Sequence, residues 1–360
     1  MVPSGIRALV ASFVGGVASC YLCPTVAVLQ TYSLVSDMHK KAPQYVRAQS
    51  QMADAFGMEV PLDIAWLTSI IPLDFVPREI EISPDEKTLY VAHESGNEIS
   101  VFSLFEPFDV RSIKGAGAGD ITLSPDGKRL YSVGSKKCYV IDTENLTVIR
   151  TLASAKVNRI VCSPDGCFIC LSFQDMPGGL IRVIRTDDYQ VENDFDLGAL
   201  SNASLALAVS PQSDRIFASV LADGIALSAV SVIDPVGYGQ DDIPGFADPR
   251  SMAISSDGSR LYVGGIDEVY IADGTSGRMY YREKIGCQGY PVKIIGITPD
   301  DRYVYVVYTC NFDVYRVDTV KGTVSCIAYF PSVGGSVLSK AGTRLYTTHS
   351  DMSWVSIYQL

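Results

Sequence analysis

The sequence predicts an all-β fold, a seven-bladed β-propeller of four-stranded antiparallel blades. Two observations carry this prediction. A turn of the Ser-Pro-Asp-Gly type between two apolar runs occurs seven times, and successive turns start 39 to 47 residues apart. That spacing fits one blade per repeat and is too long for ankyrin or leucine-rich units. The turns begin at Ser83, Ser124, Ser163, Ser210, Ser255, Thr298 and Ser339.

Each turn residue has a local conformational role. The Ser or Thr hydroxyl can bond a backbone group, Pro fixes φ at the second position, Asp bonds the backbone two residues on, and Gly accepts a positive φ. The pattern therefore predicts tight hairpins, and it assigns these aspartates to turns and not to chemistry.

Two further strands follow each turn. The first is rich in aromatic and β-branched residues, as in residues 88–92 and 260–263. The next ends at an Asp that precedes another turn, as in residues 138–142 and 313–318. The last blade lacks a fourth strand, because the chain stops after residues 354–360. An open edge favours unwanted pairing, so we expect residues 64–71 to close the ring as the outer strand of that blade.

The second strands carry tetrapeptides that resemble the motif of the YVTN family of seven-bladed propellers. The nearest matches are Tyr-Val-Ala-His at 90–93, Tyr-Val-Gly-Gly at 262–265 and Tyr-Thr-Thr-His at 346–349. The resemblance covers roughly residues 64 to 360. It implies the propeller fold and leaves function open, because the family includes surface-layer and adhesion proteins, lactonase-like enzymes and many members of unknown role.

Residues 1–60 lie outside the repeats, and residues 61–360 form the predicted propeller domain. The apolar segment 8–29 fits a secretory signal, a membrane anchor or a buried helix, and residues 30–60 read as a polar helical linker. We therefore expect a short helical N-terminal extension and a secreted or membrane-anchored protein, with a cytoplasmic protein as the alternative.

Composition limits the partners. The formal net charge is -11 and the pI is about 4.8, so a generally basic surface for nucleic acid is excluded. The nine cysteines suggest metal binding, but Cys167 and Cys170 lie three apart on a predicted strand and point to opposite faces. We expect a monomer with no metal and no cofactor, since neither a phosphate-binding loop nor a nucleophile elbow is found.

A small-molecule site would lie at the centre of the ring, at the end opposite the turns. Several polar residues, most of them cationic, fall four or five positions before the turns: Arg78, Asn158, Arg159, Arg250 and Lys293. In so acidic a protein, converging cations favour an anionic ligand. The alternative is purely structural pairing, of Arg78 with Glu79 or Asp120 and of Arg250 with Asp248.

Two of the three histidines, His93 and His349, take the last position of the YVTN-like motif, and Tyr308 takes it in the sixth blade. Ring closure makes these three blades consecutive. A catalytic site of His93, His349 and Tyr308 acting on a carbonyl compound is one interpretation. The other is that each histidine only caps its loop.

Together these features predict a binding or scaffold propeller that recognises a protein or a small anionic ligand on its top face. The alternative is a lactonase-like hydrolase or isomerase with its active site at the top of the channel.

Overall fold

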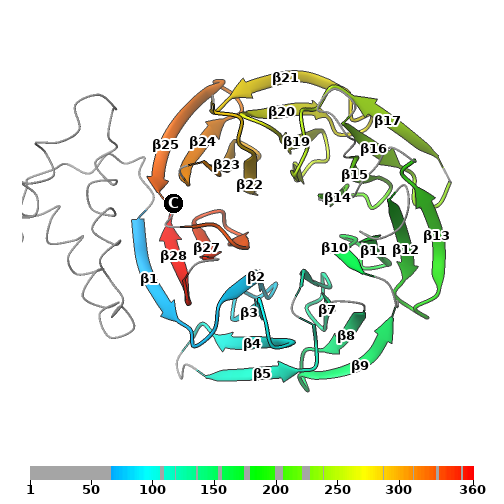
Figure 1. The fold of residues 1–360 in the computed structure, drawn as a ribbon, viewed down its shortest axis with the longest axis vertical. Coiled ribbons are helices and arrows are strands. Elements are labelled where there is room, and N and C mark those ends of the chain that lie inside the picture. Colours follow the sequence, from blue (N-terminus) through cyan, green and yellow to red (C-terminus); the bar gives the residue numbers. More distant parts are fainter. Residues whose placement is uncertain are drawn as a thin grey trace, which may run out of the picture.

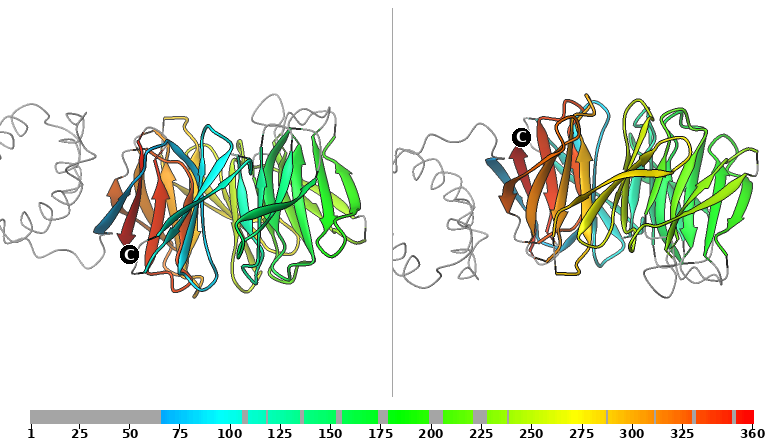
Figure 2. Two further views of the ribbon diagram at one scale, coloured as in Figure 1. Left: turned by 90° about the horizontal axis from the view of Figure 1, so that it is seen from below. Right: turned by 90° about the horizontal axis from the view of Figure 1, so that it is seen from above.

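The computed structural model describes residues 66–360 apart from short gaps at 106–108, 118, 135–136, 153–155, 174–178, 199–205, 221–227, 238, 287, 311, 330–331 and 350–351. The described residues form strands and turns. Seven four-stranded antiparallel sheets stand around a common axis, and the strand that precedes each Ser-Pro-Asp-Gly-type turn is the one nearest the centre (Figure 1). Seen from the side, the seven sheets form a flattened ring (Figure 2). The predicted fold class is confirmed.

The first six blades each use four consecutive strands. Blade 1 is β2 (Pro77–Ile82), β3 (Thr88–His93), β4 (Glu98–Ser103) and β5 (Val110–Lys114); blade 2 is β6 (Ile121–Leu123), β7 (Arg129–Val133), β8 (Cys138–Asp142) and β9 (Thr147–Leu152); blade 3 is β10 (Val157–Cys162), β11 (Phe168–Phe173), β12 (Leu180–Arg185) and β13 (Val191–Asp196). Blade 4 is β14 (Leu207–Val209), β15 (Ile216–Val220), β16 (Ala229–Ile233) and β17 (Gln240–Pro244); blade 5 is β18 (Ser251–Ile254), β19 (Arg260–Gly264), β20 (Glu268–Asp273) and β21 (Met279–Lys284); blade 6 is β22 (Val292–Ile297), β23 (Tyr303–Tyr308), β24 (Asp313–Asp318) and β25 (Thr323–Tyr329).

Blade 7 combines the two ends of the described chain. It contains β26 (Ser336–Leu338), β27 (Arg344–Thr348) and β28 (Trp354–Gln359), and its outer strand is β1 (Trp66–Pro72). β1 pairs antiparallel with β28, and Leu67 packs in one cluster with Leu345 and Tyr358. The predicted closing strand is therefore confirmed, with bounds one or two residues later than expected.

The hydrophobic core is divided among the junctions between blades. Seven clusters of buried side chains occur in the described part of the chain, and each draws mainly on two neighbouring blades. The cluster around Leu89, Val91 and Tyr346, for example, joins blade 1 to blade 7. The ring therefore holds together through sheet-to-sheet packing repeated seven times.

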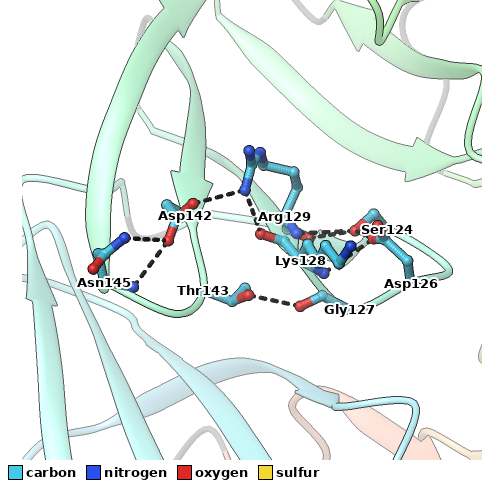
Figure 3. A network of polar contacts seen from close by, with 8 residues as sticks. All are labelled: Ser124, Asp126, Gly127, Lys128, Arg129, Asp142, Thr143 and Asn145. Atoms are coloured by element: carbon cyan, nitrogen blue, oxygen red, sulfur yellow. Dashed lines mark hydrogen bonds and ion pairs between the residues drawn. The ribbon is translucent and has the colours of Figure 1, made fainter.

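The predicted turns have the expected geometry. In blade 2, the Ser124 hydroxyl donates to Asp126 at 2.6 Å and accepts the N–H of Arg129, while Gly127 has φ of 71° (Figure 3). Arg129 also bonds Asp142, which caps the next turn through Asn145. The turn aspartates thus hold backbone, as predicted.

The fourth turn position has a positive φ in all seven repeats. Four are glycines, and the others are Glu86, Ser213 and Asp301, with φ of 58°, 59° and 56°. A side chain in this region is strained by about 1 kcal/mol, so these three positions require a compensating contact.

Residues 1–60 and the apolar segment 8–29 lie outside the described residues, and the expectations about export, tethering and a helical extension stay predictions. Within the described part of the chain, none of the elements is a helix with the length and apolar character of a membrane span.

Candidate functional site

A cavity of about 520 Å³ lies at the centre of the ring. Its walls are residues from the beginning and the middle of the inner strands, and the loop residues Pro291 and Thr309 also line it. It therefore runs from the end of the channel opposite the Ser-Pro-Asp-Gly turns, where a ligand site was expected, into the middle of the channel, because Glu81 and Thr122 of the lining lie two residues before their turns. Three acidic side chains line it, Glu79, Glu81 and Asp120, and three basic ones, Arg159, Arg250 and Lys293.

Arg159 connects three blades. Its guanidinium lies 3.1 Å from the Glu79 carboxylate of blade 1 and 3.3 Å from the Asp120 carboxylate of blade 2. The second oxygen of Asp120 accepts the backbone N–H of Ile160 at 2.9 Å. The Asp120 charge is the main reason that the pKa of Arg159 is raised, so the arginine stays charged. This network both holds blades together and fixes charge on the cavity wall.

Burial disfavours the charged form of the two acids deepest in the network. It raises the pKa of Asp120 to about 6, although Arg159 opposes the change. It raises the pKa of Glu81 to about 8, with added repulsion from Asp120 and Glu79. At pH 7 Asp120 is therefore mostly ionised and Glu81 mostly protonated.

The other two cations are held less firmly. Lys293 of blade 6 donates to the backbone carbonyl of Gly334 in blade 7, and burial lowers the pKa of Lys293. Arg250 lies 2.7 Å from Asp248, and about half of its side chain is exposed. The pairing of Arg250 with Asp248 was the structural alternative from the sequence, and it is present.

The five ligand-binding candidates therefore divide into two groups. Arg159, Arg250 and Lys293 line the cavity, whereas Arg78 and Asn158 are not among its lining residues. Arg78 is exposed and serves through its carbonyl, which accepts the N–H of Gly335. The sequence offered Glu79 or Asp120 as ion-pair partners of Arg78. Both carboxylates do form ion pairs, but with Arg159.

Sequence reasoning did not include the cavity acids among the site residues. A signal was present, since Glu79 and Glu81 lie two residues apart on a predicted inner strand and therefore share one face. Charged side chains repeated on the inner face of an otherwise apolar strand indicate a wet channel.

Each catalytic candidate has structural partners. His93 bonds the Ser100 hydroxyl at 2.9 Å and stacks on Phe75, with ring centroids 3.3 Å apart. His349 bonds the Ser356 hydroxyl at 2.8 Å and the Ser332 carbonyl at 2.7 Å. Both histidines bond a serine seven residues ahead, on the third strand of the same blade, so the shared sequence slot has a shared structural role.

Both histidine side chains are also buried. His93 is 8% exposed and His349 is fully buried. Burial lowers the pKa of His93 and lowers that of His349 to about 4, so His349 is neutral at pH 7.

Tyr308 belongs to a third local arrangement. Its hydroxyl donates to Asp267 at 2.6 Å and accepts the N–H of Gln288. The same carboxylate accepts the N–H groups of Gly289 and Tyr290. Tyr308, His93 and His349 are not among the residues that line the central cavity, and their joint catalytic role stays a prediction.

The described part of the chain contains no group of three or more His, Cys, Asp or Glu side chains placed to hold a metal ion. Cys167 lies in the turn before β11 and is exposed, whereas Cys170 lies on β11 and is buried. The two thiols therefore lie in different environments.

Comparison with known proteins supports the architecture. No family model and no curated protein matches the sequence, so the likeness to YVTN proteins stays a resemblance. Among solved structures, a chain of hydrazine synthase from Kuenenia stuttgartiensis is similar, with a TM-score of 0.68 and 16% identity over 84% of this chain and 98% of that one. In all, 1488 solved chains match, so the fold is widespread and consistent with a binding or scaffold role without selecting one activity.

Proposed function

We propose that this protein is a binding propeller whose central top-face cavity takes a small anion, a carboxylate or a phosphate compound. The observation that carries the proposal is the charge on the cavity wall. Three cations line it, Glu81 is protonated at pH 7, and only Glu79 and Asp120 remain as anions. Arg250 is balanced by Asp248 at 2.7 Å. Lys293, while it keeps its proton, is then the lining cation that the ion pairs among the described residues leave without a carboxylate partner. It lies inside a protein of net charge -11.

The shape of the site agrees with such a ligand. A volume of about 520 Å³ lies within the usual range of roughly 300–1,000 Å³ for small-molecule sites. The protein around the cavity has a lower dielectric constant than bulk water, which strengthens the attraction between a bound anion and Lys293. The ligand would also reverse part of the cost of burying the Lys293 ammonium, because an opposite charge favours the charged form.

The lactonase-like or isomerase alternative has less support. It places chemistry on His93 and His349, whose ring nitrogens already bond Ser100, Ser332 and Ser356. Recognition of a protein by the top face remains the second form of the binding proposal.

Calorimetric titration with inorganic phosphate, citrate and glucuronate, at pH 6 and low ionic strength, tests the proposal. At least one of the three should bind, and Lys293→Gln should weaken it about tenfold or more, as expected for a partly buried charge-assisted bond. Arg78→Gln is the matched control, because Arg78 shares the repeat position but lies off the cavity. Equal losses in both variants, or no binding of any of the three anions, would contradict the proposal.

A further inference from the structure

Glu81 differs from the other two cavity acids in its contacts. Glu79 and Asp120 both pair with Arg159, whereas the ion pairs among the described residues do not include Glu81. Glu81 lines the cavity two residues along β2 from Glu79 and therefore on the same face of the strand. Among the described residues, Glu81 is thus the cavity carboxyl group that has no ion-pair partner.

The charged groups of the cavity lining, together with the titratable neighbours of Glu81, come from five inner strands or the residues flanking them. Glu79 of β2 and Asp120 before β6 repel its charge, and burial is the largest contribution to its raised pKa of about 8. Cys162 of β10 lies close enough to Glu81 to interact with its charge. The cations of the lining are Arg159 of β10, Arg250 before β18 and Lys293 of β22. Burial raises the pKa of the Cys162 thiol to about 12, so this neighbour stays neutral.

A protonated carboxyl has one O–H donor that an ionised one lacks. Donation from an acid O–H to an anionic oxygen gives a short and strong bond. We infer that Glu81 holds its proton and donates it as a hydrogen bond to an oxygen of the bound anion, so that the cavity selects oxyanions over halides. This inference rests on the proposed function, and it makes Glu81 a specificity-determining residue of the same site.

Binding should then depend on the Glu81 proton. The tightest binder among phosphate, citrate and glucuronate is titrated at pH 7, 8 and 9. We expect the wild-type affinity to fall about tenfold between pH 7 and pH 9, since each pH unit above the pKa of a required acid costs up to tenfold. Glu81→Gln retains a donor that cannot ionise, so its affinity should change less than about twofold over the same range. Chloride should compete weakly in both proteins.

Lys293 is the group that could mimic this behaviour, because burial lowers its pKa. Lys293→Gln separates the two. If Glu81 titrates, the Lys293 variant binds more weakly at pH 7 yet still loses about tenfold by pH 9. A tenfold fall that persists in Glu81→Gln, or a wild-type affinity that does not change with pH, overturns the inference while leaving the anion site in place.

A measurement without ligand tests the proton itself. The infrared difference spectrum of the wild-type protein between pH 7 and pH 9 should show loss of a protonated carboxyl C=O band, and Glu81→Gln should lack that change. Absence of the band in wild-type protein at pH 7 also overturns the inference. Failure of all three anions to bind overturns the proposed function, and the role of Glu81 toward a ligand with it.

Discussion

The carboxylate of Asp301 in blade 6 accepts both the backbone N–H and the hydroxyl of Ser256 in blade 5, each at 2.7 Å. Asp301 holds the fourth position of its turn with a positive φ, and Ser256 holds the second position of the neighbouring turn. The equivalent residues of blades 1 and 7, Glu86 and Lys340, make the same kind of bond. The backbone strain at Asp301 and at Glu86 is therefore offset by a hydrogen bond from the backbone N–H of the neighbouring turn.

Four other junctions show the complementary pairing. There the second position is Pro, which has no N–H, and the fourth position of the next blade is Gly. A Cβ on that glycine would lie within 3.4 Å of the proline Cδ. The pairs are Pro84 with Gly127, Pro125 with Gly166, Pro211 with Gly258, and Pro299 with Gly342. The seventh junction joins Pro164 to Ser213, whose hydroxyl accepts the N–H of Asp165 at 3.2 Å. Six of the seven neighbouring pairs of turns therefore follow one of the two matching patterns.

This matching predicts strong coupling between two substitutions. Ser256→Pro alone should destabilise the protein by about 1–2 kcal/mol, because it removes the donor and crowds Asp301. Asp301→Gly alone should be nearly neutral, since relief of backbone strain offsets the lost bonds. The double variant should recover most of the loss, with a coupling energy of at least about 1 kcal/mol in urea denaturation.

The control for this cycle is Ser256→Ala, which keeps the backbone N–H. The coupling energy between Ser256→Ala and Asp301→Gly should be smaller than that of the Pro variant, because only the hydroxyl hydrogen bond is lost. Additive free energies for Ser256→Pro and Asp301→Gly would show that the two turns do not interact.

His349 should make the protein sensitive to acid. Its pKa of about 4 in the folded protein lies below the ordinary value of about 6.5. The unfolded chain therefore binds the proton first, and stability is lost as pH falls from about 6.5 toward 4, by about 3 kcal/mol in all. Denaturation at pH 7.5, 5.5 and 4.5 measures this loss.

His349→Gln removes that titration and should flatten the curve between pH 6.5 and 4, after an initial cost at pH 7.5 for the disturbed bonds to Ser332 and Ser356. His93→Gln is the comparison, since His93 keeps some exposure. An unchanged acid slope in the His349 variant would assign the sensitivity to other groups.

Glu81 should have the opposite effect on stability. Its folded-state pKa of about 8 lies above the ordinary value of about 4.3, so the folded protein binds the proton more tightly. Stability from this group is present at low pH and is lost as pH rises toward 8. Glu81→Gln should therefore stabilise the protein more at pH 9 than at pH 5, by a difference on the order of 3 kcal/mol after allowing for the solvent that reaches the cavity.

Thermal melts of wild-type protein and Glu81→Gln at these two pH values test this prediction. Glu79→Gln is the control, because Glu79 is paired with Arg159. A Glu81 variant that is equally stabilised at pH 5 and pH 9 would show that the carboxyl is ionised throughout.

Closure of the ring predicts a sharp difference between two truncations. Removal of residues 1–72 takes away β1, exposes the edge of β28 and leaves Leu345 and Tyr358 without Leu67. Removal of residues 1–65 leaves β1 in place. The longer truncation should melt at a much lower temperature, and equal melting temperatures would exclude β1 as a stabilising strand.

The fold was predictable because the signal repeats. Turn residues have local conformational requirements, so each Ser-Pro-Asp-Gly-like phrase marks its hairpin independently of the rest. The turn that begins at Ser339 lacks the Pro and the Asp of the pattern. It still ends at a glycine, Gly342, with φ of 70°. The closing strand followed from counting strands in the last blade.

The site was less predictable, because side-chain direction on the inner strands depends on irregularities. Register shifts lie between Pro77 and Ile80 in β2 and between Val157 and Arg159 in β10. Arg78 and Asn158 fall inside these stretches, so a fixed offset from the turn did not place them on the cavity wall. The pairing of Arg159 with Glu79 and Asp120 depends on positions 80 and 39 residues away, a relationship that local sequence does not encode.

The central claim is that an oxyanion binds in the middle of the ring, and a crystal structure grown with the tightest of phosphate, citrate and glucuronate tests it most directly. We predict electron density for the anion inside the central cavity, within hydrogen-bond distance of Lys293 Nζ and the Glu81 carboxyl. Density for the same compound only outside the cavity, with Lys293 and Glu81 in the same positions as without the anion, would contradict the account.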